Sequence, residues 1–135
     1  MKKSEFIFFR KTLNKTQVQM AQLLGVSLKA VHSYEQGWRT IPTHVERQAF
    51  FLMSKKIVET GKKKQCWVTN KCPNERKSHC PAWEFQTGEL CWFINGTICE
   101  GCAHKKWKDK ILVCRSCNFF ISIFGEVIND NTLVV

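Results

Sequence analysis

The sequence predicts two small domains of different class: an all-α helix bundle over residues 1–61, and a cysteine-rich domain with irregular or short β structure over residues 66–135. Three observations support this division. Apolar residues recur at helical spacing in the first part, as they do on the buried face of a helix. All eight cysteines lie between Cys66 and Cys117. A lysine-rich run over residues 62–65 separates the two parts, and we expect it to be a basic linker.

The first and last helices of the bundle are predicted from apolar residues spaced three or four positions apart. The first helix covers residues 2–13 and places Phe6, Phe9 and Leu13 on one side. The last helix opens at Pro42, because proline suits the first turn of a helix, and it ends near the linker. Its predicted apolar face consists of Val45, Ala49, Leu52 and Met53.

Between these helices, residues 16–39 predict two short helices joined by a tight turn. Thr16 is a good N-cap, because its hydroxyl can accept a backbone N–H of the first turn. Gly25 ends the first short helix, since glycine adopts the left-handed conformation of a helix C-cap without steric cost. Ser27 caps the second short helix, which runs over residues 28–36. The predicted apolar faces of the pair consist of Val18, Ala21, Leu23, Leu24, Ala30, Val31 and Tyr34.

This helix–turn–helix resembles the lambda-repressor-like, or Cro/XRE, DNA-binding domain. The resemblance covers about residues 4–54, and its threonine–glutamine start, Leu-Gly-Val-Ser turn and Tyr-Glu-x-Gly ending fall in one register. The residues that carry it are Thr16, Gln17, Met20, Ala21, Leu24, Gly25, Val26, Ser27, Val31, Tyr34, Glu35, Gly37 and Pro42. It implies a lambda-repressor-like helix bundle that binds double-stranded DNA.

The same resemblance implies which residues meet the DNA. A recognition helix reads bases in the major groove with its amino-terminal residues, while the preceding helix crosses the backbone. Carried onto this sequence, the base-facing residues are Leu28, Lys29, His32 and Ser33. The residues expected to contact phosphates are Lys15, Thr16, Gln17, Trp38, Arg39 and Thr40. Glu35 is expected to play a structural role, capping or pairing within the domain.

Charge is distributed unevenly along the chain, whose net charge is +10. Residues 1–65 hold 13 lysines and arginines against 4 acidic residues, which leaves +9. Residues 66–135 hold 8 against 7, which leaves +1. A basic amino-terminal half suits a polyanionic partner, because Lys and Arg displace the counterions condensed on phosphates.

No secretory signal or membrane-spanning segment is visible in the sequence. The apolar run over residues 6–9 is short and is followed at once by Arg10 and Lys11. We therefore expect a cytoplasmic protein. Cytoplasmic thiols stay reduced, so eight cysteines are better explained by metal binding than by disulfides.

Two Cys-Trp pairs, Cys66-Trp67 and Cys91-Trp92, bracket the first half of the cysteine-rich part. With Cys80-Pro81-Ala82, Gly96-Thr97-Ile98-Cys99 and a closing Cys-x-x-Cys-x-Phe at residues 114–119, they resemble the two-CW domain of bacterial regulators. Cys102 is an addition to that pattern. The resemblance covers about residues 66–120 and carries no activity that can be transferred.

The candidate metal ligands are all eight cysteines: Cys66, Cys72, Cys80, Cys91, Cys99, Cys102, Cys114 and Cys117. The last four form two Cys-x-x-Cys knuckles, a spacing that favours a tetrahedral zinc site. A proline follows Cys72 and Cys80, as it follows a ligand in bacterial ferredoxins, so a [4Fe–4S] cluster is the alternative cofactor.

The β structure expected of the second domain lies near its end. Residues 119–123 are predicted as a buried strand. Asn129-Asp130-Asn131 is predicted as a turn, because asparagine and aspartate favour turns. Residues 132–135 would then form a short strand or a frayed tail.

Together these predictions indicate a sequence-specific, DNA-binding transcriptional regulator that binds as a homodimer. Its cysteine domain would bind metal, and would stabilise the protein or sense zinc or redox state. We recognise no nucleophile–base pair and no open metal site, so we expect neither an enzyme nor a small-molecule substrate. Two alternatives stay open: a metal-stapled adaptor for protein interactions, and an iron–sulfur redox protein.

Overall fold

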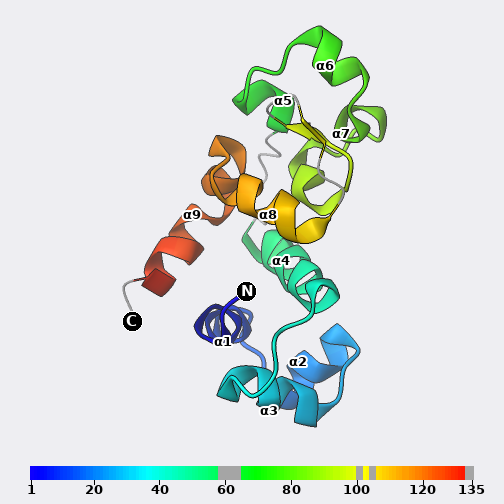
Figure 1. Cartoon of the computed structure of the whole chain (residues 1–135). Helices are drawn as coiled ribbons and strands as arrows, with labels where there is room; N and C mark the ends of the chain where they lie inside the picture. The colour runs from blue at the N-terminus through cyan, green and yellow to red at the C-terminus, as the bar shows by residue number, and fades with distance from the viewer. Residues whose placement is uncertain (58–64, 100–101, 104–105, 133–135) are drawn as a thin grey trace. The chain divides into compact units, whose positions relative to one another are not determined.

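The computed structural model describes residues 1–57, 65–99, 102–103 and 106–132 (Figure 1). The chain is mostly helical, with very little strand. It groups into two compact units, one made of Met1–Glu59 with Glu126–Val135 and one made of Thr60–Gly125. Residues 62–64 of the predicted linker lie outside the described residues. Within the described ranges, every helix is too short or too polar to cross a bilayer.

The four helices predicted for the amino-terminal part are confirmed, and each begins within one residue of its expected start. They are α1 (Lys3–Thr12), α2 (Gln17–Leu24), α3 (Leu28–Gln36) and α4 (Thr43–Ile57). We refer to these four as the amino-terminal helices. Figure 1 shows α2 and α3 joined by a short turn, as the sequence predicts.

The ends of α2 and α3 are set by the predicted local signals. The Thr16 hydroxyl accepts a hydrogen bond from the Gln19 backbone N–H at 3.1 Å, and the Gln19 side chain accepts one from the Thr16 N–H at 3.0 Å. This reciprocal pair is a capping box. Gly25 ends α2 with a φ of +67°, a left-handed conformation that glycine adopts without strain. Ser27 caps α3 by accepting from the Ala30 N–H at 3.0 Å.

The core of the amino-terminal helices follows most of the predicted stripes. Its fully or nearly fully buried members are Phe6, Met20, Ala21, Leu24, Ala30, Val31, Tyr34, Ile41 and Val45. Two expectations were wrong: Val18 is 50% exposed and Leu23 is 46% exposed. On α2 the buried residues are Met20, Ala21 and Leu24, so Met20 belongs to the core and Val18 and Leu23 do not. Because α2 has only eight residues and carries apolar groups on two sides, its packing against the neighbouring helices decides which side is buried.

The second unit is built of short helices around one small β-hairpin. Its elements are α5 (Cys66–Thr69), α6 (Asn74–Ser78), α7 (Pro81–Glu84), the 3₁₀ helix η2 (Gly88–Phe93), β1 (Ile98–Cys99), β2 (Cys102–Ala103), α8 (Trp107–Arg115) and the start of α9 (Asn118–Thr132). The strands pair antiparallel with Cys99 opposite Cys102. We refer to the described residues from 65 to 125 as the cysteine unit. In this range the predicted short β structure amounts to that one hairpin.

The carboxy-terminal end of the described chain is helical, which corrects two expectations. Residues 119–123, predicted as a strand, lie in α9, and so do residues 129–131, predicted as a turn. Thr132 ends the helix, and residues 133–135 lie outside the described residues. Phe119, Phe120 and Phe124 are buried while Ile121 is 45% exposed, a helical rather than an alternating pattern.

Trp92 is the centre of the aromatic core of the cysteine unit. It is 1% exposed, and its ring lies edge-on to Trp107, Phe120 and Phe124 at centroid distances of 6.4, 6.5 and 5.5 Å. Edge-to-face aromatic pairs add to the stabilisation that burial alone provides. These contacts join η2, which carries Cys91, α8, which carries Cys114, and α9, which begins directly after Cys117.

Candidate nucleic-acid interface and cysteine cavity

One side of α3 is exposed while the other packs inward. Leu28 is 48% exposed and Lys29 is also exposed, whereas Ala30 and Val31 are buried. His32 is exposed one turn further along, on the same side as Leu28 and Lys29. Three of the four side chains predicted to face bases therefore share one solvent-facing surface of α3.

Ser33 differs from the sequence-based expectation. It is 7% exposed, and its hydroxyl donates a hydrogen bond to the Lys29 carbonyl at 2.9 Å. A serine hydroxyl can donate a hydrogen bond to a carbonyl of the preceding helical turn, so that it needs no partner outside the helix. Ser33 therefore belongs to the helix interior and not to the base-facing surface.

The loop after α3 extends the exposed surface. Trp38 is 72% exposed, and its ring lies edge-on to His32 with a centroid distance of 5.6 Å. Arg39 and Thr40 follow and are also exposed. The backbone of this loop is anchored, because the Trp38 and Arg39 N–H groups both donate to the Ser33 carbonyl, at 2.9 and 3.3 Å.

At the start of α2 the three predicted phosphate contacts differ in their availability. Thr16 is exposed, and its hydroxyl caps α2. Lys15 is half-buried, and its carbonyl accepts from Arg10 at 3.0 Å. The Gln17 side-chain amide donates to Glu35 at 2.5 Å, so its polar atoms are engaged within the protein.

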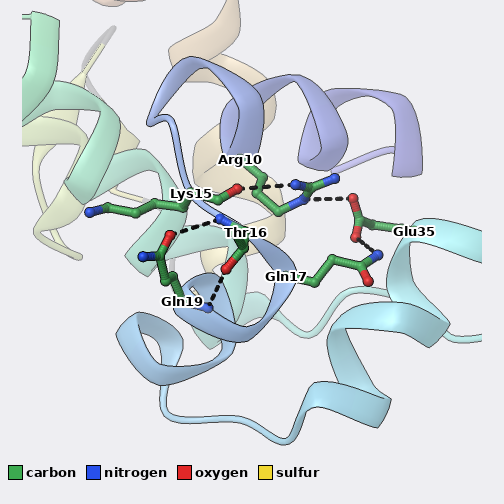
Figure 2. A network of polar contacts seen from close by, with 6 residues as sticks. All are labelled: Arg10, Lys15, Thr16, Gln17, Gln19 and Glu35. Atoms are coloured by element: carbon green, nitrogen blue, oxygen red, sulfur yellow. Dashed lines mark hydrogen bonds and ion pairs between the residues drawn. The ribbon is translucent and has the colours of Figure 1, made fainter.

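Glu35 is the point at which three of the amino-terminal helices are tied together (Figure 2). Its carboxylate accepts from the Arg10 Nε of α1 at 2.9 Å and from the Gln17 amide of α2. The side chain of Glu35 is 4% exposed and that of Arg10 is 17% exposed. The predicted structural role of Glu35 is confirmed, and the network fixes α3 against α1 and α2.

The surface charge of the amino-terminal helices is more positive than their composition suggests. The acidic side chains in residues 1–57 are Glu5, Glu35 and Glu46, and each is at most 7% exposed. Lys29, Arg39 and most of the other basic residues of this range are exposed. The charged side chains exposed to solvent in this part of the chain are therefore almost all basic.

In the cysteine unit, seven of the eight predicted ligands line one cavity of about 270 Å³. They are Cys66, Cys72, Cys80, Cys91, Cys99, Cys114 and Cys117, and all seven are free thiols. Cys102 lies in β2, and its side chain is outside what the structure describes. The walls between the thiols include Trp67, Trp83, Trp92 and Phe120.

Burial raises the pKa of four of these thiols, Cys72, Cys91, Cys99 and Cys114. It raises the pKa of Cys114 to about 11, and it also raises the pKa of Cys99. Cys91 hydrogen-bonds to Cys66; this bond and burial hold the pKa of Cys91 well above its usual range, while the same bond lowers the pKa of Cys66. A metal ion or cluster would displace these protons, because only the thiolate is a ligand.

Sequence reasoning missed one functional candidate, Lys110. It is 3% exposed on α8, and its ammonium donates to the Thr97 hydroxyl at the cavity wall. Its charge lowers the pKa of Cys66, Cys91, Cys99 and Cys114, as a smaller effect beside those of burial and hydrogen bonding. Trp107, Lys110, Ile111 and Cys114 form the buried stripe of α8 at helical spacing, and that spacing was the available signal.

The donor set fits a thiolate-bound metal or cluster, although its grouping stays a prediction. Among the described residues, no three histidine, cysteine or acidic side chains already converge as a metal site. The Asn70 amide donates to the Cys117 sulfur at 3.1 Å, a contact that suits an anionic sulfur. Comparisons of the chain with family models, with curated proteins and with solved structures gave no match.

We predict that Arg10→Met destabilises the amino-terminal helices by about 2–3 kcal/mol, because it leaves a buried carboxylate without its charged partner. The double variant Arg10→Met/Glu35→Met should recover most of that loss, since no buried charge then remains. Urea unfolding followed by far-UV circular dichroism measures both. A single variant as stable as the parent, or a double variant less stable than the single variant, would contradict the role assigned to the Arg10–Glu35 ion pair.

We predict that the metal-free protein loses stability between about pH 9 and pH 11. The folded-state pKa of Cys114 lies above its ordinary value of 9.0, so the unfolded chain loses this proton first and is favoured as the pH rises. Cys114→Ala should reduce the loss by about 2 kcal/mol. Urea unfolding followed by tryptophan fluorescence reports on the cysteine unit, which holds four of the five tryptophans. Equal losses in parent and variant would refute the prediction.

Proposed function

We propose that the protein is a sequence-specific DNA-binding transcriptional regulator with a metal-binding cysteine unit that stabilises it or senses zinc or redox state. The observation that carries the proposal is the exposed first turn of α3, with Leu28, Lys29 and His32 on one surface. A helix presented in this way can enter the major groove, where its amino-terminal residues reach base edges.

Each of the three side chains has a chemistry suited to base contacts. Lys29 can donate to guanine O6 and N7. His32 can donate or accept, according to its protonation. Leu28 can contact a thymine methyl group, because its exposed aliphatic surface matches that group. Ser33 is not included, since its hydroxyl is bonded to the Lys29 carbonyl.

Phosphate contacts would come from both ends of the helix–turn–helix. Arg39, Thr40 and the Trp38 indole lie after α3, and Thr16 and Lys15 lie at the start of α2. Such contacts fix the register of the protein on the duplex and carry no sequence information. The burial of all three carboxylates in residues 1–57 supports this role, because an exposed carboxylate would repel phosphate.

Binding as a homodimer belongs to the same proposal. Helix–turn–helix dimers read two half-sites about 34 Å apart, one helical turn of DNA. Sedimentation of the chain with and without a duplex carrying two half-sites gives the stoichiometry.

A protein-interaction adaptor is the second candidate, and one observation favours it. Val18, Leu23 and Leu28 are about half exposed, and Trp38 is 72% exposed. Apolar side chains at this exposure are enriched where proteins bind one another. An adaptor would bind nucleic acid with little dependence on salt, whereas a DNA-binding protein loses affinity steeply as salt rises.

We predict that Lys29→Ala and Arg39→Ala both weaken DNA binding, and that they do so differently. Lys29→Ala should cost about 1–3 kcal/mol on the preferred sequence and relax base preference at one position. Arg39→Ala should weaken all sequences alike and reduce the salt slope by about one. The measurement is fluorescence anisotropy with a duplex selected from a random library and with a shuffled duplex.

Lys56→Ala is the matched control, because Lys56 is an exposed lysine in the last turn of α4. Lys56→Ala should weaken DNA binding only by the small amount that results from removing one positive charge from the protein. If Lys29→Ala and Arg39→Ala behave like Lys56→Ala, the assignment of the α3 surface is wrong. A salt-independent affinity would favour the adaptor.

A further inference from the structure

We propose that the cavity lined by the seven cysteines holds one iron–sulfur cluster, and that Lys110 is the buried counter-charge of that cluster. This inference rests on the metal binding included in the proposed function and makes it specific. It concerns a single shared centre, in place of two separate zinc sites of four thiolates each.

The first argument is the arrangement of the thiols. A structural zinc ion holds four sulfurs at about 2.3 Å, so the sulfurs close around one atom. Two such sites would need two separate sets of four cysteines. Here seven thiols from six different elements or their flanks face one cavity of about 270 Å³. A polynuclear core bound by four thiolates would occupy such a space.

The second argument is the grouping of thiols within the cavity. Cys91 hydrogen-bonds to Cys66 and lies close enough to Cys99 for their charges to interact. Cys99 interacts in the same way with Cys117, and Cys114 with both Cys99 and Cys117. Cys72 interacts in the same way with Cys66 and Cys80, so all seven thiols form one connected set that includes both Cys-Trp pairs. Four ligands for one cluster are available within it.

The third argument is the charge of Lys110. A buried ammonium is unfavourable by several kcal/mol unless an anion lies near it. The ion pairs of Glu35 and Glu46 are made with Arg10 and the amino terminus, and the Lys110 ammonium donates to the Thr97 hydroxyl. The charge of Lys110 instead acts on Cys66, Cys91, Cys99 and Cys114. Four thiolates outweigh the charge of the core they bind, so the occupied cavity would be anionic and would pair with the ammonium.

The surroundings of the cavity suit a redox centre. The Asn70 amide donates to the Cys117 sulfur at 3.1 Å, and the Cys99 thiol donates to the Thr97 hydroxyl at 3.7 Å. Hydrogen bonds to cluster sulfurs and the exclusion of water set the reduction potential. Trp67 and Trp83 pack edge-to-face at 4.8 Å in the cavity wall and would limit the access of water.

The test begins with the cofactor content of the full chain. We would incubate the reduced protein under anaerobic conditions with ferric iron, inorganic sulfide and excess dithiothreitol, which supplies the electrons. In parallel we would titrate it with zinc sulfate alone. We expect about four iron and four sulfide ions per chain and the broad visible absorption of a [4Fe–4S] cluster.

The zinc titration separates this inference from the proposed function. A colourless protein that holds zinc and incorporates no acid-labile sulfide would overturn the cluster and leave a metal-binding regulator intact. A chain that retains neither zinc nor iron would overturn both. The DNA-binding measurements on Lys29 and Arg39 are independent of either result.

Lys110 is tested by its effect on the reduction potential of the cluster, measured in a spectroelectrochemical cell. Reduction adds one electron, and a nearby positive charge stabilises the more negative state. We expect Lys110→Met to shift the potential to a more negative value, or to lose the cluster that Lys110→Arg retains. Lys108→Met is the control, because Lys108 is exposed on the same helix. Equal potentials for the Lys110→Met and Lys108→Met proteins would overturn the counter-charge role.

Discussion

A buried carboxylate holds the helix–turn–helix in its shape. Glu35 lies in the last turn of α3, where the helix dipole disfavours negative charge, and burial disfavours it further. Arg10 of α1 and Gln17 of α2 offset both effects by donating to the two carboxylate oxygens. One side chain therefore links α3 to both neighbouring helices. Leu28 and Lys29 at the opposite end of α3 are exposed, and the proposed DNA contacts depend on them.

The cysteine unit presents the reverse situation. Its buried charge is the Lys110 ammonium, which donates to the Thr97 hydroxyl, and burial raises the pKa of the Cys114 thiol on the same helix. A bound metal centre would turn thiols into thiolates and would place an anionic group in the cavity near the ammonium. If the occupied cavity is anionic, its charge contrasts with the basic surface of the amino-terminal helices. Such a difference would keep the cysteine unit from competing for DNA.

The sequence was most informative where structure is decided locally. The starts and ends of α2 and α3 follow from Thr16, Gly25 and Ser27, because caps act within one turn. It failed where packing decides: Val18 and Leu23 face solvent, and the hydroxyl of Ser33 bonds to its own helix. The apolar run that became α9 has no clear period, so a strand could not be told from a helix. Cysteine spacing indicated ligands, but only the tertiary fold gathers seven of them around one cavity. Lys110 was overlooked because it lies in a lysine-rich segment, and lysine side chains are normally solvated.

The central claim is that the leading turn of α3 enters a nucleic-acid groove, and the most direct measurement is an amide-resolved NMR titration. The ¹⁵N-labelled full chain would be titrated with a selected duplex, and the changes in chemical shift would be mapped along the sequence. The account predicts that the largest changes fall at residues 28–32, with smaller ones at residues 15–17 and 38–40. Changes confined to the cysteine unit, or none at all at saturating duplex, would contradict it.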